Sequence, residues 1–299
     1  MTEKITNVRL IACDYDGTLS AGPGELTERT KAALRLAHNK GVLLALVTGR
    51  SASFVSEKVR SLPFDFIITA NGAAVEEGRT GQKLAATAID RATALAVLDA
   101  LEGFEYSKNL FLGGQYIMNP STIRYYRSHR RFPFLQRLMM SLTFWLHARV
   151  SFNIPHLIAS TNDPIEKIGC LFKTAEDCGA ALDILRELDV VEAVTTHGRD
   201  LEITARDVSK GRALIALRES LGIAQEEVIA FGDSGNDLSM VDAVGCFLAP
   251  ANATEDVKRA ATHIIPSAAE DGVAIALEAL FDRIELESDR LSDVASLLE

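Results

Sequence analysis

The chain has 299 residues, 47% of them hydrophobic and 24% charged, which is enough to bury the core of one large domain or two moderate ones. Its formal net charge of −10 argues against bulk nucleic-acid binding, which needs an excess of Lys and Arg to neutralise phosphates. Four scattered cysteines, and the lack of an apolar run of signal or membrane-spanning length, predict a cytoplasmic protein with reduced thiols and without a zinc or disulfide framework.

The first part of the chain alternates apolar strands with a helix. Residues 8–13 form an apolar run that ends at an Asp/Gly turn, and residues 31–38 repeat apolar side chains at helical spacing. Further apolar runs cover residues 42–47 and 66–68. Near-continuous apolar strands that alternate with helices are typical of a parallel sheet covered on both faces. We therefore predict an α/β fold with a doubly wound, parallel-sheet core.

The same pattern returns near the end of the chain. A helix is predicted over residues 210–221, and an apolar strand follows at residues 228–231. The two ends of the chain are therefore predicted to form one core domain, made of residues 1–85 and 194–299.

The middle of the chain has a different composition. Residues 106–162 contain no Asp or Glu but several Lys and Arg, so they form a basic stretch in an acidic protein. We predict that residues 86–193 form an inserted α+β domain. The arginines within residues 124–149 predict either a surface that recognises an anionic substrate or an ordinary solvated basic face, and both alternatives stay open.

Two carboxylates, Asp14 and Asp16, stand two positions apart where the first apolar strand gives way to a glycine loop. Functional residues often gather at the carboxyl ends of parallel strands. Neighbouring carboxylates repel each other unless a cation or a shared proton compensates, and hard oxygen ligands suit Mg²⁺. The alternative is an ordinary turn with two solvated aspartates.

Two further features lie at a strand end and a helix start. The second strand ends at Thr48-Gly49-Arg50, where a hydroxyl and free backbone N–H groups suit a phosphate, although Thr48 could equally be a plain helix cap. Lys210 begins the predicted late helix, where the helix dipole disfavours a cation unless an anion is nearby. A solvated surface lysine is the alternative reading of Lys210.

The last predicted strand ends in a loop that adds more oxygen ligands. Within residues 232–240 the loop contains Asp233, Asn236 and Asp237. A flexible acidic turn would explain this loop alone. However, all four features fall at strand ends or helix starts of one predicted domain, so their joint occurrence favours a single site.

With these four motifs in order, the sequence resembles the haloacid dehalogenase superfamily, in particular its Cof-type (subfamily IIB) phosphatases with a large cap inserted between motifs two and three. Other family-like stretches are residues 69–73, 201–204, 252–253, 257–258 and 271–274. Residues 248–251 depart from the family, because many Cof-type proteins have a Met-Gly pair there. The resemblance implies a Rossmann-like core and a cap that restricts access to small molecules.

The resemblance also implies residue roles. Asp14 would be the nucleophile that forms an aspartyl phosphate, and Asp16 would be the general acid and base. The catalytic set is Asp14, Asp16, Thr48 and Lys210. The phosphate-binding set is Thr48, Gly49, Arg50, Asn71, Lys210 and Asn236. The Mg²⁺ ligands would be Asp14, Asp16 through its backbone carbonyl, Asp233 and Asp237.

The expected function is a Mg²⁺-dependent phosphatase acting on a sugar phosphate or related small phosphometabolite. One alternative is a phosphotransferase similar to phosphomannomutases, and another is a non-catalytic, anion-binding or regulatory protein on the same fold. We expect a small phosphorylated metabolite as partner, and neither nucleic acid nor membrane. The physiological substrate and the oligomeric state are not predicted.

Overall fold

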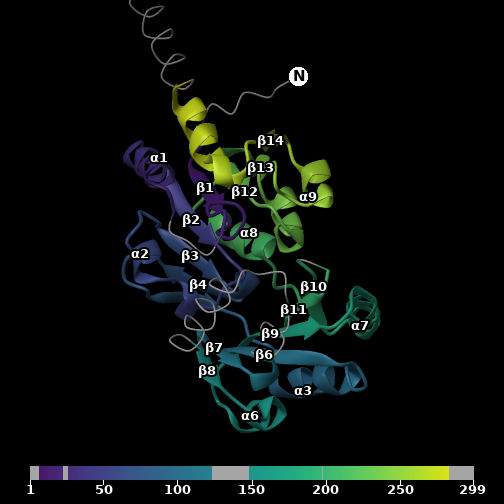
Figure 1. Ribbon diagram of the computed structural model, residues 1–299. Coiled ribbons are helices and arrows are strands. Elements are labelled where there is room, and N and C mark those ends of the chain that lie inside the picture. Colours follow the sequence, from purple (N-terminus) through teal and green to yellow (C-terminus); the bar gives the residue numbers. More distant parts are fainter. Residues whose placement is uncertain (1–6, 23–25, 123–147, 197, 283–299) are drawn as a thin grey trace, which may run out of the picture.

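The chain builds two β-sheets, which occupy the upper and lower parts of Figure 1. The computed structural model describes residues 7–22, 26–122, 148–196 and 198–282. The larger sheet has eight strands, in the spatial order β14 (His263–Ile265), β13 (Cys246–Pro250), β12 (Val228–Phe231), β1 (Leu10–Cys13), β2 (Leu43–Val47), β3 (Phe66–Thr69), β4 (Ala74–Glu77) and β5 (Lys83–Ala86). The smaller sheet has six, in the order β10 (Val191–Val194), β11 (Asp200–Ala205), β9 (Ile165–Phe172), β6 (Tyr106–Leu112), β7 (Gln115–Met118) and β8 (Ala148–Val150).

Strand β1 lies inside the larger sheet because every one of its residues is apolar and buried. It pairs in parallel with β12 on one side and with β2 on the other. The pairing stays parallel from β14 to β3, whereas at the other edge β4 pairs antiparallel with both β3 and β5. The strands predicted from the apolar runs are confirmed, whereas the antiparallel edge was not predicted.

Helices cover both faces of the larger sheet, which confirms the doubly wound α/β core. The α-helices are α1 (Glu28–Asn39), α2 (Glu57–Arg60), α3 (Arg91–Ala100), α6 (Ile154–Ser160), α7 (Ala175–Leu188), α8 (Lys210–Ser220) and α9 (Glu255–Ala260), and residues 272–282 are also helical. The 3₁₀ helices are η1 (Ala52–Phe54), η2 (Ala70–Gly72), η3 (Gln225–Glu227), η4 (Gly235–Ala243) and η5 (Ala268–Glu270). One face packs against α1 and the helix at residues 272–282, and the other packs against α8, η4 and α9.

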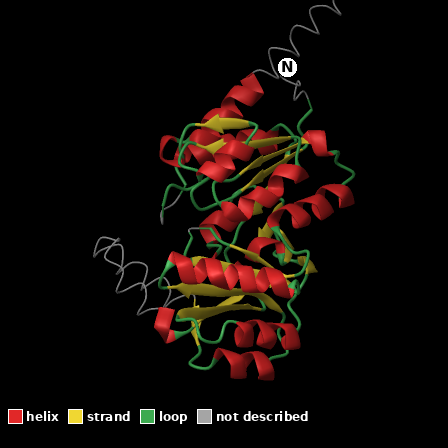
Figure 2. Ribbon diagram, turned by 90° about the vertical axis from the view of Figure 1, so that its right-hand side faces the viewer, coloured by secondary structure: helices red, strands yellow, loops and turns green. Residues whose placement is uncertain are grey.

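The smaller sheet has its own core. Helices α3, α6 and α7 pack on one of its faces, and Figure 2 shows the two sheets as separate layers with their own helices. Residues Phe111, Tyr116 and Met118 form a small apolar cluster with Ala70 and Ala73 of the η2 region. The second face of the smaller sheet is therefore turned toward the loops of the larger sheet.

Strand β11 belongs to the smaller sheet, where it pairs with β9 and β10. The predicted core segment 194–299 includes the residues of β11. The apolar side chains of β11, Leu201 and Ile203, instead pack into the core of the smaller sheet. The basic stretch 124–149 lies outside the described residues except for its last two positions. All four cysteines are free and buried.

Candidate active site

The sequence-predicted residues meet at the carboxyl ends of the central parallel strands of the larger sheet. Asp14 directly follows β1, and Thr48 directly follows β2. Asn71 lies in η2 after β3, and Asp233 lies two residues after β12. Because the strands are parallel, their carboxyl ends share one edge of the sheet, where ligands usually bind in open α/β folds.

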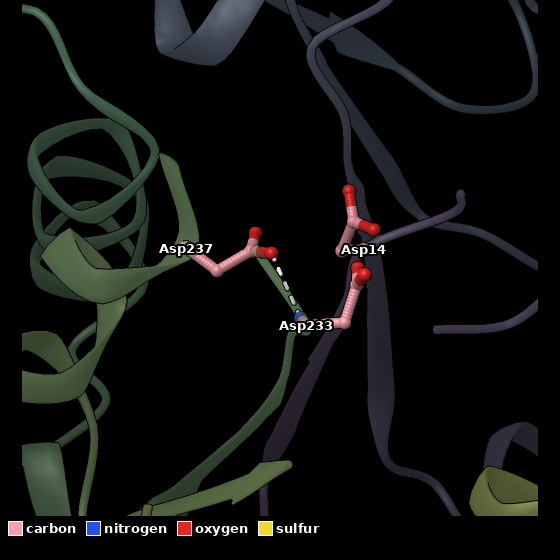
Figure 3. Close-up of side chains that lie close together, drawn as sticks. All are labelled: Asp14, Asp233 and Asp237. Atoms are coloured by element: carbon pink, nitrogen blue, oxygen red, sulfur yellow. Dashed lines mark hydrogen bonds between the residues drawn. The ribbon is translucent and has the colours of Figure 1, made fainter. Parts of the chain in front are cut away.

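Three of these carboxylates form one cluster, which Figure 3 shows in close-up. Asp14, Asp233 and Asp237 each offer an oxygen atom within 4.8 Å of the other two. Asp14 and Asp233 come from adjacent strand ends, and Asp237 approaches from η4 on the other side. Three carboxylates this close repel one another, so the cluster has the charge and the oxygen atoms to hold a divalent cation.

Lys210 connects two members of the acidic cluster. Its Nζ donates to Asp14 Oδ1 at 2.6 Å and to Asp237 Oδ1 at 2.7 Å. Lys210 is the first residue of α8 and is 1% exposed. Burial acts to lower the pKa of Lys210, but the charges of Asp14 and Asp237 override it and raise the pKa. The lysine is therefore an ammonium, and the alternative of a solvated surface lysine is wrong.

Burial raises the pKa of Asp14 well above its ordinary value. Lys210 opposes this rise, whereas Asp237 and Asp233 add to it through charge repulsion. One ammonium thus does not fully compensate the carboxylates around Asp14. A further positive charge at this position would favour the ionised, nucleophilic form of Asp14.

Both oxygens of Asp237 already have protein partners. Its Oδ1 accepts from Lys210, and its Oδ2 accepts from the backbone N–H groups of Asp233 and Ser234, both at 3.0 Å. The dashed line in Figure 3 marks the bond to Asp233. Asp237 therefore fixes both Lys210 and the loop that presents Asp233.

The Asp16 side chain is not part of the acidic cluster. Its carboxylate accepts two hydrogen bonds from Arg50, from Nε at 2.7 Å and from Nη2 at 2.6 Å, and it is 54% exposed. The Arg50 guanidinium also lies 4.5 Å from the centre of the Tyr15 ring. Arg50, predicted to bind phosphate, is thus paired with the predicted acid and base at the open side of the site.

The remaining predicted residues are also near the strand ends. Thr48 is buried, and its hydroxyl accepts from the backbone N–H of Arg50 at 3.1 Å. Asn71 and Asn236 are joined by a hydrogen bond of 3.1 Å from Asn236 Nδ2 to Asn71 Oδ1. Both amides are buried, and both also donate to a residue of the smaller sheet.

Glu202 on β11 is the residue of the smaller sheet that accepts from both amides. It forms an ion pair with Lys167 on β9, whose Nζ lies 2.6 Å from Glu202 Oε1. Sequence reasoning missed both as functional residues. Glu202 lies in the family-like stretch at residues 201–204 but has no predicted role there, and none of the predicted motifs includes Lys167. The available signal was a pair of charges inside an otherwise apolar strand, since Lys167 and Glu166 interrupt β9.

Among the described residues, no helix combines the length and the apolar character needed to cross a lipid bilayer.

The comparisons with known proteins agree on one family. A putative phosphatase of Bacillus subtilis strain 168, YxeH, is 29% identical over 277 residues, with 91% of this chain and 98% of the relative covered. The 5-amino-6-(5-phospho-D-ribitylamino)uracil phosphatase YwtE of the same organism is 27% identical over 288 residues, with 91% and 98% covered. A solved haloacid dehalogenase-like hydrolase from B. subtilis has a TM-score of 0.80 at 26% identity, covering 91% of this chain and 99% of that one.

A sugar phosphatase of HAD subclass IIB shares the fold, with a TM-score of 0.74 at 22% identity over 91% of this chain and 98% of that one. A model of haloacid dehalogenase-like hydrolases matches residues 11–277, which include all four motifs and the whole inserted segment. The resemblance found in the sequence and the prediction of a hydrolase are both confirmed. The chain belongs to the haloacid dehalogenase-like hydrolase family.

Proposed function

We propose that this protein is a Mg²⁺-dependent phosphatase that hydrolyses a small phosphomonoester through an aspartyl phosphate on Asp14. The observation that carries the proposal is the buried contact between Asp14 and Lys210 inside the acidic cluster, at the carboxyl ends of the central strands. Relatives that are named phosphatases and cover most of this chain support the reaction class.

The residues of the cluster fit a bound Mg²⁺. They supply carboxylate oxygens, which this ion prefers, and burial together with repulsion from Asp237 and Asp233 raises the pKa of Asp14, which a bound cation would oppose. Asp14 and Asp233 would hold the ion, with the backbone carbonyl of Asp16. Asp237 would orient them, because its oxygens are already occupied by Lys210 and two backbone N–H groups.

In the reaction, a carboxylate oxygen of Asp14 attacks phosphorus, and the bond from phosphorus to the leaving oxygen breaks. For this step Asp16 would leave Arg50 and be protonated, so that it gives its proton to that oxygen and later removes a proton from the water that hydrolyses the aspartyl phosphate. Lys210 stabilises negative charge on Asp14 and on the transferred phosphoryl group. Thr48 and Gly49 bind phosphoryl oxygens at the end of β2. The bound cation would supply further stabilisation of the same charge.

We also propose that the smaller sheet acts as the cap. Residues 86–193 would form it as predicted, and its strand β11 adds residues 200–205. Contacts between the two sheets support this arrangement, since Ser53 of η1 donates its backbone N–H to Gly114 and its hydroxyl accepts from Tyr116. A cap at this position covers the leaving-group side of the strand ends and limits the substrate to a small molecule.

For the substrate we propose a sugar phosphate or a related phosphorylated metabolite. YwtE, which covers most of this chain, is named for a compound with a phosphorylated ribityl group, and this supports a polyhydroxylated leaving group.

The test is phosphate release from a panel of sugar phosphates and p-nitrophenyl phosphate, with Mg²⁺ or with EDTA. Asp14→Asn is expected to lower kcat by at least about 10³-fold, because removing the nucleophile leaves only the binding and electrostatic contributions. It is expected to fold, since it removes a buried carboxylate whose ionisation burial opposes. Mg²⁺ is expected to raise the Tm of the wild type more than that of Asp14→Asn. Wild-type turnover in the variant, or turnover that EDTA leaves intact, would contradict the proposal.

A further inference from the structure

A partly buried ion pair joins the smaller sheet to the phosphate-binding edge of the larger one. Lys167 on β9 has a side chain that is 1% exposed, and its Nζ lies 2.6 Å from Oε1 of Glu202 on β11. The ammonium also lies 4.2 Å from the centre of the Phe111 ring. Removing the Lys167 ammonium from water is unfavourable unless it has an anionic partner and further hydrogen bonds, and here Glu202 is that partner.

The second oxygen of Glu202 is used by the larger sheet. Asn71 Nδ2 donates to Glu202 Oε2 at 2.7 Å, and Asn236 Nδ2 donates to the same oxygen at 3.2 Å. Asn236 Nδ2 is also 3.1 Å from Asn71 Oδ1. One carboxylate oxygen therefore fixes the rotamers of both amides, which come from loops after β3 and β12.

Gly49 completes the arrangement. Its carbonyl oxygen accepts from Lys167 Nζ at 2.5 Å. A Cβ atom at Gly49 would lie 2.9 Å from Asn71 Oδ1 and 3.3 Å from Asn236 Nδ2, so the two amides can lie this close to the end of β2 only because this residue is glycine. The ion pair thus contacts three residues of the predicted phosphate-binding set, namely Gly49, Asn71 and Asn236.

The charge state of Glu202 fits this role. Burial acts to raise its pKa, but the charge and hydrogen bond of Lys167 and the hydrogen bond from Asn71 override it, so the pKa lies below the ordinary value. An ionised carboxylate accepts stronger hydrogen bonds than a neutral group. Lys167 therefore keeps Glu202 in the form that holds the amides most firmly.

We propose that Glu202, neutralised by Lys167, is a positioning residue that holds Asn71, directly and through Asn236, in the orientation required to bind the substrate phosphate. The inference rests on the proposed phosphatase function. It assigns to two residues of the smaller sheet a part in binding the phosphate itself, in addition to any contact of that sheet with the leaving group.

The test replaces the whole ion pair, because removing one partner would leave an unpaired buried charge. Apolar residues of similar size in place of both partners are often neutral for stability, so Lys167→Met/Glu202→Leu is expected to fold with a Tm within about 5 °C of the wild type. The matched control is Arg60→Met/Glu76→Leu, which removes a different partly buried pair, 3.1 Å long, between α2 and β4. The readouts are the Kd for inorganic phosphate by calorimetry with Mg²⁺, and KM and kcat for p-nitrophenyl phosphate.

We expect the Lys167/Glu202 variant to bind phosphate at least about tenfold more weakly and to raise KM more than it lowers kcat, whereas the control changes neither beyond about twofold. Asn71→Ala should cause a similar loss, and adding it to the Lys167/Glu202 variant should cost less than about twofold more, because the residues act as one unit. If the pair variant does not fold, Glu202→Asp, which keeps the charge but shortens the side chain, should still raise the phosphate Kd and KM.

Unchanged phosphate affinity in a folded pair variant, an equal loss in the control, or losses that multiply in the combined variant would overturn the inference. In each of these cases the phosphatase proposal would still stand, provided that the wild type releases phosphate and Asp14→Asn does not. A wild type that neither binds nor releases phosphate would overturn both.

Discussion

The negative charges of buried and partly buried carboxylates in this protein are compensated by different kinds of partner. Asp237 accepts from two backbone N–H groups and from Lys210, and Glu202 has the ammonium of Lys167. Glu166, beside Lys167 on β9, is fully buried but has only the backbone N–H of Gly114 at 3.0 Å and the Lys83 ammonium at 3.6 Å. Incomplete compensation is therefore found at a buried carboxylate outside the candidate active site as well.

This difference predicts a pH-dependent stability effect of Glu166→Gln. Burial raises the pKa of Glu166 above its ordinary value, and Lys83 only partly opposes it. Between the unfolded and folded pKa values the folded state keeps a proton that the unfolded state has lost, so wild-type stability falls as pH rises through that window. Gln does not titrate and can still accept from Gly114.

We therefore expect Glu166→Gln to match the wild type near the low end of the window, at about pH 4, and to become progressively more stable than it at higher pH. Urea unfolding at several pH values measures this difference. A difference that stays constant with pH, or that shrinks as pH rises, would contradict the assignment.

Individual residues divide clearly into those the sequence could reveal and those it could not. Asp14, Asp233 and Lys210 were found because each stands at a strand end or helix start, where its residue type is unfavourable without a ligand. The pairing of Asp16 with Arg50 could not be predicted, because it depends on side-chain directions across two loops. Lys167 and Glu202 are far apart in sequence, and only the pairing of β9 with β11 brings them together.

At the level of elements, the contact between α8 and η4 positions Lys210. Ser209 caps α8 by accepting from the backbone N–H of Arg212, and Gly211 N donates to the Ser239 hydroxyl at 3.0 Å. A Cβ atom at Gly211 would lie 1.8 Å from the backbone oxygen of Ser239. The first turn of α8 can therefore approach η4 this closely only with glycine at this position.

Gly211→Ala is expected to destabilise the protein by about 3 kcal/mol or more, because backbone atoms must separate to admit the methyl group. It should also lower kcat, since Lys210 precedes the shifted residue. The control is Gly179→Ala in α7, where a Cβ would meet nothing within 4 Å. That variant should gain up to about 1 kcal/mol from the better helix propensity of Ala. Chemical unfolding measures both, and equal effects of the two changes would contradict this view of the α8–η4 contact.

Elements with a continuous apolar pattern were predictable, and the others were not. Strands β1, β2, β3 and β12 are buried on both faces, so their sequences are apolar except for Thr69 at the end of β3. Strand β5 is exposed along its whole length, and its residues carry no comparable pattern. Each strand of the smaller sheet has one face on the core of that sheet and one face toward the larger sheet. Charged and apolar side chains therefore mix along these strands, and neither the number nor the order of the strands could be predicted from the sequence.

At the scale of the whole molecule, an aromatic pair links the two sheets. The rings of Phe54 in η1 and Tyr116 on β7 are 5.3 Å apart in an edge-to-face arrangement. Tyr116 makes a second such contact with Phe111. The pair lies beside the hydrogen bonds of Ser53 to Gly114 and Tyr116, so it fixes how the smaller sheet sits over the strand ends.

Phe54→Ala is expected to lower stability by about 1–3 kcal/mol and to raise KM severalfold, because the loss of the aromatic contact loosens the placement of the smaller sheet. The control is Phe104→Ala, which removes an edge-to-face pair with Phe172 inside the core of the smaller sheet. It should lower stability to a similar degree without changing KM. Equal effects of both variants on KM would show that the Phe54 contact has no special part in placing the smaller sheet.

Strand β1 lies between β2 and β12, so the candidate active site forms only after a late part of the chain pairs with an early one. Asp14 meets Lys210 across 196 residues of sequence, and β1 gains its second neighbour only when β12 is available. Contacts of such long range close slowly, and an unpaired apolar strand edge is prone to aggregate meanwhile. During synthesis, the nascent chain therefore carries Asp14, its proposed nucleophile, long before β12 and Lys210 have been made, and one side of its central strand stays unprotected until β12 follows.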